Sequence, residues 1–318
     1  MKGIWLEDKK LSLKNDVALP VLDANEVLIQ TNLAGICATD LEMVKGYYSF
    51  TGVLGHEFVG TVVDAPGHEY LNGKRVVGNI NITCGRCDSC LQGRQSHCED
   101  RRTLGIWNYQ GVFSEFFKLP VENLYLVPDA VSDEQAVFTE LLAAALQINR
   151  QVHIKPTDKV IVVGAGRLGL LIAQVLKLSA GDLTVVVRRP EPTIMLDKWG
   201  IKWAYTEELT QGKADVVIEA TGSPNGFVLS QQLVRPAGKL VLKSTFANDV
   251  QLNLSKLVVN EVQVIGSRCG PMAGALRLLE NGLVNTDDMI SNEYPIMQGL
   301  EAFEEAASPG VLKVLLLF

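Results

Sequence analysis

The pattern of apolar and polar residues changes at about residue 150. Before it, short β-branched runs at 27–31, 58–63 and 75–78 are interrupted by Gly, Pro and Asn, which predicts a β-rich region. A helix is expected over 133–149, because Ser132 can cap it and Gln135 stands at the capping-box position.

Beyond residue 150 the strands become continuously apolar and alternate with stretches of helical length. The expected strands are 159–163, 183–187, 214–219, 239–242 and 263–265, with a helix over 168–178 after the first. Such alternation indicates a parallel sheet covered on both faces, a doubly wound Rossmann arrangement.

This pattern predicts an α/β protein of two domains. A doubly wound domain occupies 151–271, and a β-rich domain combines 1–150 with 272–318. The apolar tail at 314–318 has the length of a strand and is expected to pair in a sheet. A length of 318 residues fits two domains of roughly 100–200 residues each.

Composition excludes several classes of protein. The net charge of -7 and a pI of about 5.3 argue against a nucleic-acid-binding surface. We expect no membrane helix, because no stretch of about 18 apolar residues occurs. The first ten residues lack an apolar segment, so we expect no signal peptide. Clustered cysteines without a secretory signal favour metal binding in a reducing cytoplasm.

Four cysteines form the sharpest motif of the chain: Cys84, Cys87, Cys90 and Cys98. Their spacing suits one tetrahedral structural zinc with no position left for water. An Fe–S cluster or free thiols are the alternatives. A nucleic-acid-binding zinc knuckle is disfavoured, because the surroundings lack a basic, aromatic face.

A glycine-rich turn follows the first apolar strand. Gly164, Gly166 and Gly169 make a G-x-G-x-x-G motif, with Arg167 and Leu168 inside it. Between a strand and a helix, this motif predicts a dinucleotide site whose phosphates bind at the helix N-terminus. A turn without a nucleotide is the alternative.

The end of the next strand bears on the choice of cofactor. An acidic residue there would bind the ribose of NAD, but Arg188 and Arg189 stand in its place. Guanidinium groups bind phosphate through paired hydrogen bonds, which favours NADP(H). NAD(H) stays open, because Glu191 is near in sequence and the arginines could simply be solvated.

Three scattered residues could bind a second metal. Cys37 and His56 are each, in isolation, more often structural than ligands. Glu140 begins an otherwise apolar helical stretch, where an unpaired carboxylate would be costly and a metal would remove that cost.

Together with the glycine-rich turn, these motifs resemble the zinc-containing medium-chain dehydrogenase/reductase family over essentially the whole chain. The matching segments are GICATD, GHEFVGTVV, the four-cysteine motif, GVFSEFFKLP, TELLAAAL and VVGAGRLG. The resemblance is nearer to the polyol, sugar and threonine dehydrogenases, because Glu140 rather than a Cys stands at the third ligand position.

The resemblance implies a role for each matching residue. Cys37 and His56 would bind a catalytic zinc, with Glu140 as the third ligand or holding a zinc-bound water. Glu57 would lie close to the metal and exchange with water as a ligand. Thr39 would pass on the substrate proton, and Asp40 would orient the zinc-binding histidine.

In the cofactor domain the resemblance and the strand ends implicate Thr221 and Arg268, while Cys269 is expected to be structural. Three departures from the family pattern bear on substrate identity. Glu42 replaces a common relay histidine, so Glu42, the ribose hydroxyls or water would carry the proton. Leu141 replaces a proline, and the segment 64–73 is short.

The expected activity is hydride transfer between NADP(H), or NAD(H), and an alcohol or carbonyl substrate, with two zincs per chain. Alternatives are a carbonyl reductase acting on a larger cyclic or tetrapyrrole-like substrate, and a non-catalytic nicotinamide-binding protein. The last would predict damaged zinc ligands, whereas Cys37, His56 and Glu140 are all present. The family resemblance also implies a homodimer or homotetramer, and the cysteine usage predicts that it is cytoplasmic.

Overall fold

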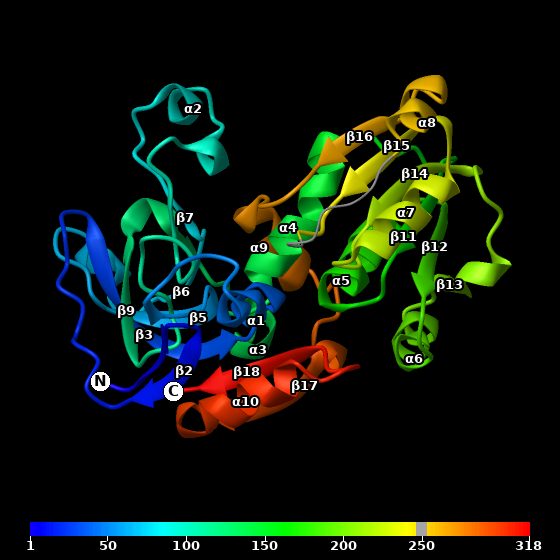
Figure 1. The fold of residues 1–318 in the computed structure, drawn as a ribbon. Helices are drawn as coiled ribbons and strands as arrows, with labels where there is room; N and C mark the ends of the chain where they lie inside the picture. The colour runs from blue at the N-terminus through cyan, green and yellow to red at the C-terminus, as the bar shows by residue number, and fades with distance from the viewer. Residues whose placement is uncertain (246–252) are drawn as a thin grey trace. The chain divides into compact units, whose positions relative to one another are not determined.

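The computed structural model describes residues 1–245 and 253–318 and divides into two compact units. The first unit comprises Met1–Glu140 and Met272–Phe318, and the second comprises Leu141–Pro271. Figure 1 follows the chain through both units. The expected division differs in residues 141–150, which belong to α4 (Thr139–Gln151).

The first unit is built on a sheet in the order β10-β6-β5-β3-β18-β17, with β9 also pairing β3. A smaller sheet has the order β2-β1-β4, and β7 pairs β8. The strands are β1 (Gly3–Glu7), β2 (Lys10–Lys14), β3 (Glu26–Gly35), β4 (Gly52–Val53), β5 (Glu57–Asp64), β6 (Arg75–Gly78), β7 (Asn81–Ile82), β8 (Arg102–Thr103), β9 (Phe116–Pro120), β10 (Leu124–Leu126), β17 (Ile290–Pro295) and β18 (Lys313–Leu317).

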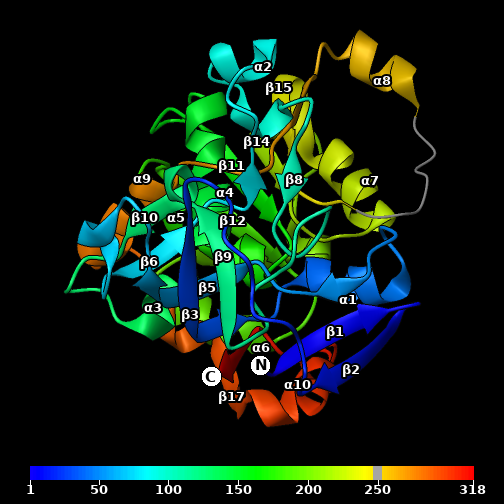
Figure 2. The same ribbon diagram turned by 90° about the vertical axis from the view of Figure 1, so that its left-hand side faces the viewer.

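The C-terminal tail closes this sheet. Val314, Leu315 and Leu316 in β18 are fully buried, so the apolar run is stabilised by removal from water. β18 pairs parallel with β17 and antiparallel with β3. Figure 2 shows the β1–β2 hairpin, with α10 (Gly299–Ala306) beside it. Two edge-to-face ring contacts, Phe58–Phe117 and Phe113–Phe303, belong to the core.

Where one helix was predicted over 133–149, the structure has two. The predicted Ser132 capping box is present, but α3 covers only Asp133–Ala136. The Thr139 hydroxyl donates to the Ala136 carbonyl at 2.6 Å, and α4 begins at this threonine. A hydrogen bond from a side chain to a nearby carbonyl competes with the backbone hydrogen bonds of a continuous helix, which explains why α3 and α4 are separate. The remaining helices of the unit are α1 (Ala38–Lys45), α2 (Asp88–Leu91) and α9 (Met272–Glu280).

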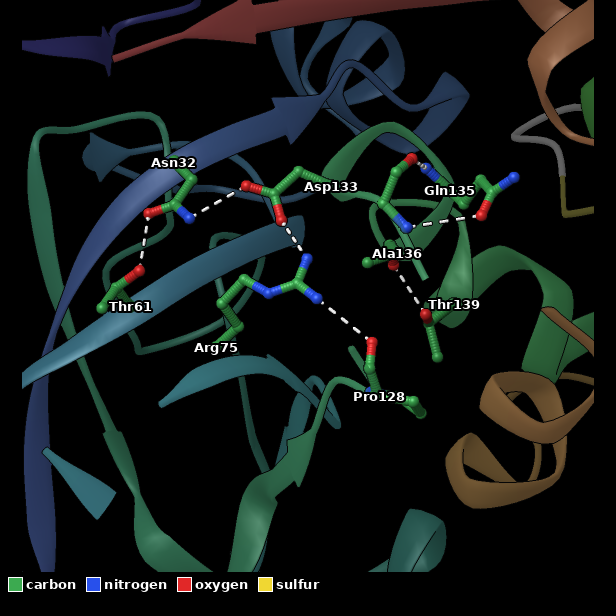
Figure 3. A network of polar contacts seen from close by, with 9 residues as sticks. Asn32, Thr61, Arg75, Pro128, Asp133, Gln135, Ala136 and Thr139 are labelled. Carbon is green, nitrogen blue, oxygen red and sulfur yellow. Dashed lines mark hydrogen bonds and ion pairs between the residues drawn. The ribbon is translucent and has the colours of Figure 1, made fainter. Parts of the chain in front are cut away.

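A polar network attaches α3 to the sheet (Figure 3). The Asp133 carboxylate accepts hydrogen bonds from Asn32 in β3 at 3.0 Å and from Arg75 in β6 at 2.7 Å. Asn32 accepts in turn from the Thr61 hydroxyl, and Arg75 donates to the Pro128 carbonyl. Because the network spans three strands, it fixes the first turn of α3 against the sheet.

The second unit has the doubly wound sheet that the sequence predicts. Its strand order is β13-β12-β11-β14-β15-β16, and every neighbouring pair is parallel. The strands are β11 (Lys159–Val163), β12 (Asp182–Val187), β13 (Lys202–Tyr205), β14 (Ala214–Glu219), β15 (Val234–Leu242) and β16 (Gln263–Gly266). The order reverses between β11 and β14, which is where dinucleotides bind in such sheets.

α-Helices precede β12, β13, β15 and β16 of this sheet. They are α5 (Arg167–Lys177), α6 (Glu191–Lys198), α7 (Pro224–Leu233) and α8 (Leu254–Val259). The core contains Ile161, Val163, Val217 and Leu240, all nearly inaccessible to solvent, with Phe227 of α7 packed on them. Within the described ranges, every helix is too short or too polar to traverse a bilayer.

Candidate metal and cofactor sites

The pairing of β3 with β5 brings three possible metal ligands together in the first unit. Gly35 at the end of β3 pairs with Glu57 at the start of β5. Cys37 follows β3 as the N-cap of α1, and His56 precedes β5. One ligand atom from each of Cys37, His56 and Glu57 lies within 4.8 Å of the others. A thiolate, an imidazole and a carboxylate are a typical donor set for zinc.

Asp40 orients two of these residues at once. Its Oδ2 atom accepts a hydrogen bond from the Cys37 backbone N–H at 2.8 Å, and its Oδ1 atom lies 3.2 Å from Nδ1 of His56. A carboxylate beside Nδ1 favours the proton on that nitrogen and leaves Nε2 for a metal. Asp40 is fully buried, as expected for a group that positions its neighbours.

The charges around His56 and Glu57 favour positive charge at this position. Burial lowers the pKa of His56, but Asp40 and Cys37 raise it more, so the net pKa lies well above 6.5. Glu57 is fully buried, and its Oε1 atom has no hydrogen-bond partner within the described parts of the chain. A buried carboxylate oxygen left in this state is costly, so the residues fit a bound metal ion.

The other expected residues lie around this group in different ways. Thr39 is on the first turn of α1, with its hydroxyl 3.9 Å from the Cys37 sulfur. Glu140 lies on the first turn of α4 and is outside the group whose ligand atoms converge within 4.8 Å. Glu42 forms a surface ion pair with Lys45 at 2.8 Å, so its carboxylate is engaged away from the buried ligands.

Lys313 is a buried residue of this region that the sequence reasoning missed. Its ammonium forms an ion pair with the Glu57 carboxylate, and both side chains are completely inaccessible to solvent. The signal that could have found it is a single lysine in the otherwise apolar segment that ends the chain.

The four clustered cysteines also converge. The sulfurs of Cys84, Cys87, Cys90 and Cys98 all lie within 4.8 Å of one another. Backbone N–H groups of Arg86 and Cys87 lower the pKa of Cys84 to about 7, while burial raises the pKa of Cys90 to about 12. A bound cation would favour the thiolate form of all four side chains, Cys90 included, and four sulfurs suit tetrahedral zinc.

In the second unit, the geometry of the glycine-rich turn fits a phosphate cradle. Gly164 has a φ of +110°, which only glycine adopts without strain. A Cβ on Gly169 would lie 2.0 Å from the Gly164 carbonyl oxygen, whereas a Cβ on Gly166 would meet nothing within 4 Å. Gly166 caps α5, so open space stands before the backbone N–H groups of that helix.

The remaining expected cofactor residues lie at the ends of the strands. Arg188 is exposed directly after β12, and Arg189 is half-buried beside it. Thr221 follows β14 and donates from its hydroxyl to Glu219 at 2.6 Å. Arg268 is exposed after β16. All four therefore stand at the carboxyl edge of the sheet, the edge along which nucleotides bind.

Two family models match the chain. The alcohol dehydrogenase GroES-like domain matches residues 23–129, and the zinc-binding dehydrogenase domain matches residues 168–281. The sorbitol dehydrogenase of Halalkalibacterium halodurans is 32% identical over 93% of this chain and 93% of its own length. The D-arabinitol dehydrogenase 1 of Uromyces fabae is 30% identical over 95% and 92%.

Solved structures share the fold along the entire chain. An alcohol dehydrogenase (rspB) of E. coli CFT073, solved with NADH, has a TM-score of 0.91 at 26% identity and covers 100% of this chain and 99% of its own. A protein described as a zinc-binding dehydrogenase of Sinorhizobium meliloti 1021, bound to NADP, has a TM-score of 0.92 at 27% identity with the same coverage. The chain therefore belongs to the polyol dehydrogenase branch of the zinc-containing medium-chain dehydrogenase/reductase family, whose members are NAD(P)-dependent alcohol oxidoreductases.

Proposed function

We propose that this protein is a zinc-dependent dehydrogenase that oxidises a secondary alcohol of the polyol or sugar class and catalyses the reverse reduction. The observation that carries the proposal is the convergence of Cys37, His56 and Glu57, where the buried Oε1 atom of Glu57 has no hydrogen-bond partner among residues 1–245 and 253–318. The sorbitol and arabinitol dehydrogenases among its relatives support a polyol substrate.

Cys37, His56 and Glu57 would hold the catalytic zinc, and Glu140 would hold a water near it. Bound zinc supplies Lewis acidity, which lowers the pKa of an alcohol that reaches it. Asp40 keeps the His56 ring in one orientation, so that Nε2 remains a ligand. The Thr39 hydroxyl would take up the alcohol proton while giving its own to water, since Glu42 is paired with Lys45 at the surface.

Cys84, Cys87, Cys90 and Cys98 would hold a second, structural zinc. Four sulfur ligands complete a tetrahedron and leave no position for a substrate, so this ion would stabilise its loop without taking part in the reaction. The proposal is therefore two zincs per chain with separate roles.

The cofactor would bind along the carboxyl edge of the second sheet. Its pyrophosphate would lie against the open face of Gly166, contacting N–H groups of Arg167, Leu168 and Gly169. Arg188 and Arg189 would contact the 2′-phosphate, which makes NADP(H) the preferred cofactor. The E. coli structure holds NADH and the Sinorhizobium meliloti structure holds NADP. The choice of cofactor therefore differs among similar structures, and in this chain we attribute it to Arg188 and Arg189.

We also propose that the protein works in the cytoplasm as a homodimer or homotetramer. β16 is the last strand of its sheet, and the preceding helix α8 exposes Leu254, Val258 and Val259 to 62%, 74% and 79%. Apolar side chains exposed together beside a strand edge are a typical protein–protein contact. Light scattering in solution tests this assembly.

The activity is tested with a panel of polyols, sugars, amino alcohols and aromatic alcohols, each assayed with NAD and NADP. We expect turnover of at least one polyol or sugar, tighter binding of NADPH than of NADH, and loss of turnover in Cys37→Ser. The proposed substrate class would be contradicted if protein shown to hold zinc and cofactor turned over no compound of the panel.

A further inference from the structure

The buried ion pair between Lys313 and Glu57 lies directly behind the proposed catalytic metal site. The two residues are 256 positions apart in the chain and belong to β18 and β5, which flank β3. Gly35, at the end of β3, lies between them: a Cβ there would lie 2.9 Å from Oε2 of Glu57 and 3.1 Å from Cδ of Lys313. The glycine leaves the space in which the pair meets across the sheet.

The two oxygens of the Glu57 carboxylate have different surroundings. Oε2 binds the Lys313 ammonium, whereas Oε1 is buried with no hydrogen-bond partner among the described residues. Glu57 also has an oxygen within 4.8 Å of the ligand atoms of Cys37 and His56. The carboxylate is therefore shared between a fixed ammonium on one side and the metal position on the other.

The charges explain what this sharing achieves. A thiolate and a carboxylate bring two negative charges, which together neutralise a zinc ion and weaken its attraction for a substrate oxygen. The buried ammonium offsets one of them, because charges interact strongly where water is excluded. Because the ammonium also occupies Oε2, only Oε1 of Glu57 would be left for a metal, and a coordination position would stay open for substrate.

We propose that Lys313 is a positioning residue that limits Glu57 to one weakly donating oxygen and so keeps the zinc open and electrophilic. The inference rests on the proposed function, since it requires a metal at Cys37, His56 and Glu57. It adds a residue outside the ligand set, from the C-terminal strand, that sets the strength of one ligand.

Cobalt substitution tests this inference by a signal that does not depend on turnover. Zinc is kept on the four clustered cysteines, and Co²⁺ is placed at Cys37, His56 and Glu57. The visible absorption of Co²⁺ is strong with four ligands and weak with five. In Lys313→Met the released carboxylate would bind through both oxygens, so absorption should weaken and Co²⁺ release to a chelator should slow. Lys313→Arg keeps the charge and should restore the wild-type spectrum.

Lys243→Met is the matched control. Lys243 is also a buried lysine, 8% exposed, but its ammonium donates to the Ala144 and Arg268 carbonyls in the second unit. Its removal should leave the cobalt spectrum unchanged.

The outcomes separate this inference from the proposed function. A wild-type protein that takes no Co²⁺ at Cys37 and His56 would overturn the metal site itself. A folded Lys313→Met protein with the wild-type spectrum and release rate would leave the site standing and overturn the role of Lys313. If that variant does not fold, a crystal structure of zinc-loaded wild type decides. We expect one Glu57 oxygen on zinc and the other on Lys313, and both oxygens on zinc would contradict the inference.

Discussion

Replacing Gly166 by alanine should separate cofactor binding from stability. An added Cβ would meet no atom within 4 Å, and Gly166 has a φ of -86°, which alanine adopts without strain. The substitution restricts the unfolded chain, which favours folding, but alanine is a poorer N-cap than glycine, so the free energy of unfolding should change by less than about 1 kcal/mol. The methyl group would nevertheless occupy the space proposed for the pyrophosphate, and we expect NADPH to bind at least about tenfold more weakly, or about 1.4 kcal/mol.

Gly169→Ala provides the contrast within the same turn. Its Cβ would lie 2.0 Å from the Gly164 carbonyl oxygen, so backbone must move and stability should fall by about 1–3 kcal/mol. Thermal unfolding and fluorescence titration with NADPH measure the two quantities on each variant. The proposed phosphate cradle would be refuted if Gly166→Ala bound NADPH as tightly as wild type. The steric argument would be refuted if Gly166→Ala unfolded as easily as Gly169→Ala.

Three further predictions concern other parts of the molecule. Because the folded-state pKa of His56 is raised, His56 should stabilise the metal-free protein fully below pH 6.5, and this stabilisation should be lost as the pH rises through the higher folded-state pKa. Bound zinc requires the neutral ring, so the stabilisation by zinc should increase as the pH rises. Urea unfolding with and without zinc measures both effects. Asp133→Asn should lower the free energy of unfolding by about 1–2 kcal/mol, because it removes the ion pair with Arg75. Glu42→Gln removes an exposed ion pair with Lys45 and should lower it by less than about 0.5 kcal/mol in the same assay. Arg188→Glu should weaken NADPH binding about tenfold or more and NADH binding much less, and equal losses in titration would count against a phosphate contact.

The second unit could be predicted closely from the sequence because its strands are buried on both faces. The run Lys159–Val163 was expected as a strand and forms β11 with those bounds, and the glycine-rich turn follows it directly. Local composition is sufficient there, since an apolar run followed by glycines leaves few alternatives. The break between α3 and α4 was not predicted, because it depends on a Thr139 hydroxyl bond that competes with a helical pattern continuing on both sides.

The metal site shows where sequence reasoning stops. Cys37, His56 and Glu57 were expected near one metal only through a family resemblance, because their convergence depends on the register in which β3 and β5 pair. The Lys313 contact depends on a further pairing, that of the last strand with β3. Such long-range pairings place distant side chains together, and nothing near Lys313 in the chain indicates which carboxylate it meets.

The most direct test of the account is the zinc content of purified protein, measured together with turnover, in wild type, Cys37→Ser and Cys98→Ser. Cys37 and Cys98 belong to different ligand groups, so each substitution should remove one ion and leave the other. We predict two zincs per chain in wild type and one in Cys37→Ser, which should stay folded but lose turnover. A Cys37→Ser protein that retains both zincs and wild-type turnover would contradict the claim that Cys37, His56 and Glu57 hold the catalytic metal.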